Sequence, residues 1–453
     1  MAHLNKKNIQ QLLEAKKFDE LRHQFSCTDP ADVADALDEL DSDELEMVFS
    51  ILDNEIASEV LSEMDPDEIE DVLDRLPPSR LAKVMEEMAP DDAADLFNDL
   101  DTQEQNQILH FFDPEKKKEI QELAHYEEDT AGGLMTPEFC AVSSEATVQQ
   151  AIGALAEADY SDPITSVFVV DQEGHLVGDI NISELISKPG KALVKEVIDP
   201  DPVFTFVDED QMEVAQKVRK YDLLVIPVVD HDKKLIGRIT VDDIIDVIDE
   251  EASEDIARMA GAPDIEHNES SPLSIVRLRL PWLLITMVTG TLVSVVIQKI
   301  TNIEHAVCLV AFIPVILGMG GNTGMQATAV TIRSIALGEI KFSRLAGIFR
   351  REMLVGAIMG TVCSIIIAAV VWVNLTYFGN TDPGISLLRL IIVVACSMFS
   401  AMTFAALTGT VFPIVLHRFN IDPAVASGPF VSTGNDLSAS LIYLVMCYLM
   451  LTV

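Results

Sequence analysis

The chain has 453 residues, of which 49% are hydrophobic, and it carries a formal net charge of −42 at pH 7. The charge is concentrated in residues 1–270, which hold 67 of the 73 acids, whereas residues 271–453 hold six acids and are mostly apolar. A field this negative attracts cations and repels nucleic acid, so a nucleic-acid-binding function is excluded. The six cysteines show no paired spacing, which argues against a disulfide framework and a zinc site.

Residues 1–130 form an acidic segment, and residues 29–113 within it repeat every twelve residues. The marker positions are Asp29, Asp41, Asp53, Asp65, Pro77, Ala89, Asp101 and Asp113, and an apolar residue precedes each of them from Leu40 onward. Asp followed by Pro, as at residues 29–30, is an N-cap before the favoured first position of a helix. The period therefore predicts one short helix per repeat, stacked into an all-α superhelical domain with a continuous core.

Residues 131–199 and 200–245 carry a second kind of repeat, in which strands alternate with helices. Residues 167–178 match residues 226–237 at a constant offset of 59, and each copy ends in a strand that leads into a helix. This doubled α/β pattern resembles a tandem pair of cystathionine-β-synthase (CBS) domains, a module often used for regulation by ligands. We therefore expect a first and a second CBS domain in these two stretches.

An acidic helix is expected from Asp242 to Asp255. It contains eight acids together with an apolar stripe at helical spacing. We assign residues 246–272 to a connecting (plug) helix and linker, which is well placed to couple the soluble part to the membrane part.

The membrane part comprises residues 273–453. Charged residues divide it into long apolar stretches at residues 280–298, 305–332, 353–381, 390–416 and 423–453, the last interrupted only by Asp436. A helix needs about 20 apolar residues to cross the hydrocarbon, so five transmembrane helices are predicted. The first residues lack the apolar core of a signal peptide, and the basic loops then fall on the cytosolic side. This predicts a multi-pass protein of the cell (plasma or inner) membrane with a cytosolic N-terminus and an outer C-terminus.

Two membrane segments have an unusual composition. Residues 314–326 are rich in glycine, which predicts either irregular backbone lining a water-filled path or close helix packing through small residues. Residues 422–436 combine hydroxyls, an amide, carbonyls beside proline and the carboxylate of Asp436. An acid within a span is costly and indicates a function, with a structural hydrogen bond as the alternative. Oxygen ligands of this kind suit a partly hydrated Mg²⁺ ion.

With its three parts in this order, the chain resembles the MgtE family of magnesium channels. The most specific segments are residues 131–136, 320–324 and 423–436. The resemblance implies a homodimer with a helical N-terminal domain, a CBS pair, a plug helix and five membrane helices. It also implies that Mg²⁺ is both the substrate and the regulator.

The resemblance further implies functional residues. Asp436 is the expected pore carboxylate, contributed by each chain to a shared two-fold axis. The expected pore-lining residues are Gly320, Gly321, Asn322, Gly324, Gly428, Pro429, Ser432 and Thr433. The expected cytosolic Mg²⁺ ligands are Asp91, Asp95, Asp210, Asp222, Asp243, Asp246, Glu251, Glu254 and Asp255.

The predicted function is a Mg²⁺ channel or transporter gated by cytosolic Mg²⁺, and the alternative is a transporter of Co²⁺ or Mn²⁺ regulated by nucleotide at the CBS pair. Thr240 and Asp243 favour ATP as a partner. Against it, Ser183 stands where nucleotide-binding members carry Arg, so a phosphate loses a charge-assisted partner. Met212 stands where the family tends to carry an acid, which weakens the site near Asp210. No activated nucleophile, metal-binding histidine spacing or phosphate-cradling loop indicates an enzyme.

Overall fold

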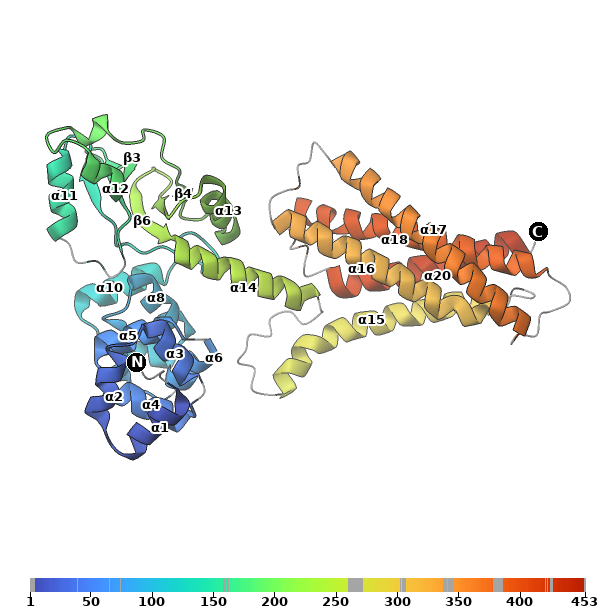
Figure 1. Ribbon diagram of the computed structural model, residues 1–453, viewed down its shortest axis with the longest axis horizontal. Helices are drawn as coiled ribbons and strands as arrows, with labels where there is room; N and C mark the ends of the chain where they lie inside the picture. The colour runs from blue at the N-terminus through green and yellow to red at the C-terminus, as the bar shows by residue number, and fades with distance from the viewer. Residues whose placement is uncertain are drawn as a thin grey trace. The chain divides into compact units, whose positions relative to one another are not determined.

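The computed structural model describes residues 5–451, apart from internal gaps, as two compact units. The gaps are residues 39, 65, 74, 158–159, 161–162, 260–271, 302, 304–306, 337–339, 341–344, 378–385, 420, 422 and 424–426. Unit 1 is Met1–Ile248 and unit 2 is Asp249–Val453. The first contains the short helices and the sheets, and the second contains the long apolar helices (Figure 1).

Short helices build the N-terminal part of unit 1. They are α1 (Lys6–Glu14), α2 (Phe18–Phe25), α3 (Pro30–Leu37), α4 (Ser42–Ile51), α5 (Asn54–Ser62), α6 (Pro66–Leu73), α7 (Pro78–Met85), α8 (Pro90–Asp99), α9 (Thr102–Ile108) and α10 (Pro114–Leu123). From α3 to α10 each helix begins twelve residues after the one before it, so the all-α repeat domain is confirmed. Asp65, one of the marker positions, lies outside the described residues.

Aspartate caps explain why helices begin at this interval. The side chain of Asp101 accepts hydrogen bonds from the backbone N–H groups of Gln103 and Glu104, and Glu104 accepts one in return from the Asp101 backbone. Asp41 forms the same reciprocal capping box at the start of α4. Such a box satisfies backbone donors that have no partner within the helix. The repeat is therefore encoded locally, one cap at a time.

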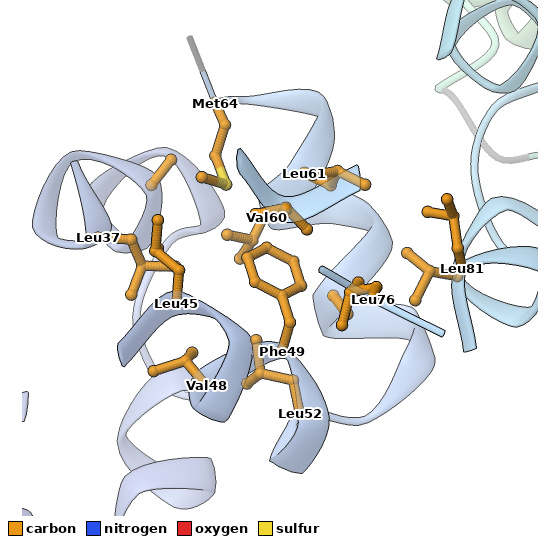
Figure 2. Close-up of a cluster of buried hydrophobic side chains, with 14 of the residues drawn as sticks. Leu37, Leu45, Val48, Phe49, Leu52, Val60, Leu61, Met64, Leu76 and Leu81 are labelled. Atoms are coloured by element: carbon orange, nitrogen blue, oxygen red, sulfur yellow. The ribbon is translucent and has the colours of Figure 1, made fainter. Parts of the chain in front are cut away.

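The apolar residue before each cap fills the core. Leu52, Leu76 and Leu100 are at most 6% exposed. Alternate helices pack on each other, α3 on α5, α5 on α7 and α7 on α9, with α4 on α6 and α8 on α10. Figure 2 shows Phe49 among the leucines of this core, with Val60 beside it. Because each such side chain contributes about 1.5–3 kcal/mol when buried, this core is the main stabilising element of the stack.

Two small sheets with matching registers form the middle of unit 1. Their strands and short helices are β1 (Ala141–Ser143), α11 (Val148–Glu157), β2 (Ser166–Val170), β3 (Leu176–Asn181), α12 (Ile182–Ser187) and η1 (Val194–Glu196), then β4 (Thr205–Phe206), α13 (Gln211–Tyr221), β5 (Val225–Val229) and β6 (Leu235–Thr240). Each central strand is parallel to the first strand and antiparallel to the third. Val167 pairs with Ile180 as Ile226 pairs with Ile239, so the offset of 59 holds in space as well as in sequence.

The hairpin turns of the two repeats bond to each other. The backbone N–H of Leu176 donates to the carbonyl of Lys233, and that of Leu235 donates to the carbonyl of Gly174. Arg238 is 1% exposed and donates from Nε to the carbonyl of Glu138. These bonds join the two CBS-like repeats into one module.

Helix α14 (Val241–Met259) follows β6 without a break. The expected border between the second CBS domain and the connecting helix, at residues 245–246, therefore lies inside one continuous helix. The CBS pair and the connecting segment therefore share one helix.

Long apolar helices make up most of unit 2. They are α15 (Pro272–Thr301), α16 (Ile313–Ala336), α17 (Leu345–Tyr377), α18 (Leu387–Arg418) and α20 (Ser432–Leu451), with the short turns η2 (Val307–Phe312) and η4 (Ser427–Val431) between them. Five helices of the described chain are long and apolar enough to cross a membrane, as the sequence predicts. Helix α18 packs against α16, α17 and α20.

The capping boxes generate a stability prediction. Asp101→Ala should destabilise the N-terminal domain by about 1 kcal/mol, because it removes the acceptor of both helix-start bonds. Asp113→Ala is the matched control and should cost less, since Asp113 precedes α10 without a side-chain cap bond. Guanidinium unfolding followed by circular dichroism compares the two, and equal losses of stability would contradict the role given to the box.

Candidate pore and cation-binding sites

Glycines on α16 let α18 and α20 approach closely. A methyl group at Gly320 would lie 3.4 Å from Cβ of Ala439, and one at Gly324 would overlap the amide of Asn435. A methyl group at Gly409 of α18 would overlap the carbonyl oxygen of Gly324. Helix α16 is unbroken from Ile313 to Ala336, so the expectation of irregular backbone at residues 314–326 is wrong. The alternative, close packing through small residues, accounts for these glycines.

Asp436 lies at the start of α20, just after a break in regular helix. The preceding residues form a π-helical turn, η4, and α20 begins at Ser432. The Asp436 side chain is half-buried, and a methyl group at Gly321 would touch its Oδ1 atom at 3.4 Å. Ser432 and Thr433, one turn earlier, are also half-buried. A carboxylate, two hydroxyls and a glycine surface thus lie together at this break.

Gly428, within η4, lies against the end of the acidic helix. A methyl group at residue 428 would overlap the carbonyl oxygen of Met259, the last residue of α14. Only glycine permits this approach. The acidic helix therefore ends in contact with the segment that leads into Asp436.

The expected pore-lining residues consequently fall into different environments. Gly321, Ser432 and Thr433 lie on the side of Asp436, Gly320 and Gly324 are buried between helices, Gly428 meets α14, and Asn322 is exposed on α16. The side chain of Pro429 lies outside the described residues.

A second group of acids gathers in unit 1, where α8 meets the start of α14. Ala94 of α8 and Ile244 of α14 belong to one hydrophobic cluster with residues of the second CBS-like repeat. This packing brings the acids of the two helices together. We call the set Asp91, Asp92, Asp95, Glu128 and Asp243 the α8–α14 acid cluster.

Asp95 is electrostatically strained within this cluster. Loss of hydration among crowded neighbours raises the pKa of Asp95 to about 7, and the charges of Asp92, Glu128, Asp99 and Asp243 add to the rise. The side chain nevertheless keeps contact with solvent. A hydrated cation can therefore reach a carboxylate whose pKa is raised by the charges of neighbouring acids.

Asp243 experiences the same repulsion from the other side. Burial, together with the charges of Asp242 and Asp92, raises the pKa of Asp243 to about 6. Hydrogen bonds from the backbone N–H and the hydroxyl of Thr240 to Oδ2, at 3.0 and 2.6 Å, act in the opposite direction. A donor set made of carboxylate and hydroxyl oxygen atoms, with several acids close together, fits a hard divalent cation.

Two other expected ligands lie at opposite ends of α13. Asp210 caps the helix by accepting hydrogen bonds from the backbone N–H groups of Met212 and Glu213, at 2.9 and 3.3 Å. Asp222 ends it in a left-handed conformation with φ of 52°. A helix of 11 residues is about 16 Å long, so these two acids cannot bind one ion.

The remaining expected ligands lie along α14. Asp246 is exposed, Glu251 is half-buried, and Glu254 forms an ion pair with Arg258 at 2.7 Å. The side chain of Asp255 lies outside the described residues.

The structure also shows a group that sequence reasoning missed. The turn between β2 and β3 holds three side chains that could bind a metal ion, Asp171, Glu173 and His175. Among the described residues, this is the one such group whose ligand atoms all lie within 4.8 Å of one another. His175 Nδ1 lies 2.9 Å from Asp171 Oδ2, and this hydrogen bond lowers the pKa of Asp171 to about 2. The spacing of the three residues, at every second position, is the sequence pattern that could have indicated this group. The α8–α14 acids are spread more widely, a spacing that suits an ion retaining several waters.

These features define a class. The class is that of membrane transport proteins for cations. Three features define it: apolar helices that can cross a membrane, an acid beside a break in one of these helices, and an acidic soluble part that contains a CBS pair. Family models agree: the MgtE intracellular N domain matches residues 28–129, the CBS domain residues 131–190 and 194–250, and the MgtE divalent cation transporter domain residues 313–446.

Relatives narrow the class to a family. The chain is 39% identical over 331 residues to the magnesium transporter MgtE of Enterococcus faecalis, covering 73% of this chain and 71% of the relative. It is 36% identical over 349 residues to that of Thermus thermophilus, covering 76% and 75%. A crystal structure of the soluble part of a magnesium transporter matches with a TM-score of 0.51 and 34% identity, over 54% of this chain and 97% of that one. The chain belongs to the MgtE family of magnesium transporters, which are not enzymes.

The raised pKa values generate a prediction of pH dependence. An acid whose pKa is higher in the folded than in the unfolded chain adds stability below its unfolded pKa, and this contribution disappears as pH rises through the folded value. Without divalent cations, the melting temperature of the protein should therefore fall as the pH rises from 5 to 8. Asp95→Asn should raise it at pH 8 by about 2–4 °C, corresponding to about 1 kcal/mol after solvent screening.

Asp35→Asn is the matched control, since it makes the same charge change at an exposed position of α3. Thermal unfolding in EDTA across this pH range measures all three proteins. An identical pH slope in wild type and Asp95→Asn would contradict the assignment of strain to Asp95.

Proposed function

We propose that the protein is a homodimeric Mg²⁺ channel or transporter and that Asp436 of each chain binds the passing ion. The observation that carries the proposal is the placement of Asp436 at the break between η4 and α20, facing Gly321. An acid in a membrane span is costly and is retained for function. Because Mg²⁺ releases water reluctantly, one carboxylate per chain with nearby hydroxyls and waters is a suitable ligand set.

The proposed orientation has the N-terminus in the cytosol and the C-terminus outside the cell membrane. Basic residues support it, because Arg333 lies at the end of α16, Arg350 and Arg351 near the start of α17, and Arg418 at the end of α18. With five spans, these ends fall on the side of the N-terminus, and basic residues concentrate on the cytosolic side of membranes.

Cytosolic Mg²⁺ closes the path by binding at the α8–α14 acid cluster. In the absence of a cation, Asp95 and Asp243 repel each other, which disfavours the arrangement that holds α14 against α8. A bound cation removes the repulsion and shifts the population toward that arrangement by its binding energy. Because α14 ends at Met259 against Gly428, its position bears directly on the segment before Asp436.

The nucleotide alternative is less well supported by the geometry. Thr240 and Asp243, the pair that favours ATP in the sequence, bond to each other at the start of α14. Ser183 likewise donates its hydroxyl to Asn181. ATP binding stays a prediction of the sequence.

Replacing the pore acid tests the transport proposal. Asp436→Ala should abolish Mg²⁺ flux into proteoliposomes, and Asp436→Asn, which keeps the shape without the charge, should lose nearly all of it. Glu352→Gln, which removes an acid from α17, should keep most of the flux. Flux with Mg²⁺, Mn²⁺ and Co²⁺ gives the selectivity, and gel filtration checks that each variant is a folded dimer. Wild-type flux in Asp436→Asn would refute the role of Asp436.

Neutralising the cluster tests the gating proposal. In the triple variant Asp91→Asn, Asp95→Asn and Asp243→Asn, closure should need about tenfold more cytosolic Mg²⁺, because a coupling of 1–3 kcal/mol is lost. The control neutralises Asp32, Asp35 and Glu46, which are exposed acids of α3 and α4. Patch currents recorded against internal Mg²⁺ compare the two. If both variants close at the wild-type concentration, the cluster is not the sensor.

A further inference from the structure

We propose that Asn435 and Thr408 position the pore acid: their hydrogen bond fixes the rotation of α20 and thereby aims Asp436 at the ion path. The inference rests on the proposed function, because it takes Asp436 as the ion ligand. The sequence drew attention to Asn435 only as the amide of residues 422–436, and it did not mark Thr408. Asn435 is the immediate neighbour of Asp436, and Thr408 is contributed by a different helix, α18.

Asn435 is held between three helices. It is 3% exposed, and its Oδ1 accepts a hydrogen bond of 2.8 Å from the hydroxyl of Thr408. Its amide lies directly on Gly324 of α16, where any side chain would overlap it. Gly324 in turn lies against Gly409, which accepts a hydrogen bond of 2.9 Å from Thr328. The amide therefore connects α20 to both α16 and α18 at one point.

A purely structural role explains this arrangement poorly. The Nδ2 atom of Asn435 is buried and has no hydrogen-bond partner among the described residues. A buried polar group with an unused donor destabilises a fold, and an apolar side chain of similar volume would avoid that cost. Packing alone therefore does not call for an amide beside Gly324. The directional bond to Thr408 supplies what an apolar residue lacks, a single preferred rotation of α20.

The rotation of α20 decides where Asp436 points. Consecutive residues on a helix are separated by about 100°, so fixing Asn435 against Gly324 also fixes the direction of the next side chain. Asp436 then faces Gly321, one turn before Gly324 on α16. A carboxylate lies roughly 5–6 Å from the helix axis, so a rotation of about 10° would displace it by about 1 Å. Mg²⁺ demands near-ideal geometry, and such a displacement weakens its binding more than it disturbs the fold.

Thr408→Val is the discriminating variant, because it keeps the shape of the side chain and removes only the hydroxyl. We expect the Mg²⁺ concentration for half-maximal flux to rise about tenfold, as is typical when a partner that orients a metal ligand is lost. Thr408→Ser keeps the hydroxyl and should restore the wild-type value. Asn435→Leu should give a similar rise, and the double variant with Thr408→Val should be no worse than Asn435→Leu alone, because the two residues share one interaction.

Thr403→Val is the matched control on the same helix. Among the described residues its hydroxyl bonds to the Phe399 carbonyl one turn earlier in α18, at 2.8 Å. The Thr408 hydroxyl likewise lies 3.1 Å from the Phe404 and Ala405 carbonyls of α18, so both variants lose contacts within the helix and only Thr408→Val loses the bond to α20. Half-maximal flux of Thr403→Val should therefore stay at the wild-type concentration. Mg²⁺ uptake into proteoliposomes at graded concentrations gives half-maximal and maximal flux separately. Melting temperature in detergent reports the fold of each variant, so that a loss of folded protein is not mistaken for a loss of affinity.

The outcomes separate this inference from the proposed function. If Asp436→Asn loses flux while Thr408→Val binds Mg²⁺ as wild type does, the positioning role is refuted and the pore acid stands. A lower melting temperature of Thr408→Val with an unchanged half-maximal concentration also refutes it, since it assigns the bond to stability alone. Wild-type flux in Asp436→Asn refutes the proposed function itself.

Discussion

The free-energy cost of holding ionised carboxylates close together or within an apolar helix underlies both proposed functional regions. At Asp95 and Asp243 the cost is visible in the raised pKa values, which arise from burial and from neighbouring acids. At Asp436 it follows from the position of the acid within an apolar helix. In both places a hard cation relieves the cost, because oxygen ligands are what such ions prefer. In the proposed function, the same chemistry serves a transported ion and a regulatory ion.

Close backbone contact is the second requirement of the membrane part. The glycines of α16 and α18 bring three helices together around Asn435, so polar groups there meet partners on other helices instead of lipid. In a membrane, where apolar side chains gain little by leaving lipid, such packing and interhelical hydrogen bonds hold helices together. The region around Asp436 is therefore defined by small residues as much as by the acid.

Features encoded by nearby residues could be predicted from the sequence. The twelve-residue period placed the start of each helix from Pro30 to Pro114, because caps and the apolar residues before them act within one turn. The offset of 59 likewise foretold the matching registers of β2 and β5. In both cases a short sequence pattern occurs more than once, and its repetition allows the structure to be predicted.

Features that depend on distant residues were not predictable in this way. Glycine density at residues 314–326 indicated a weak helix, yet partners on α18 and α20 keep α16 regular. The bond between Thr408 and Asn435 joins residues 27 positions apart, and no local pattern indicates that the two meet. The meeting of Asp95 with Asp243 depends on how α8 packs against the second CBS-like repeat.

The alternate packing of the N-terminal helices has a consequence for how the chain folds. Since α3 packs on α5 and α5 on α7, partners in this core are separated by only about two repeats along the chain. Domains whose contacts are this local have a low contact order and fold fast. The acidic domain precedes the membrane helices in the chain, and domains generally fold as units during synthesis. Most of its core can therefore form while the membrane helices are still being made, and Ala94 and Leu123 complete their burial against the second CBS-like repeat.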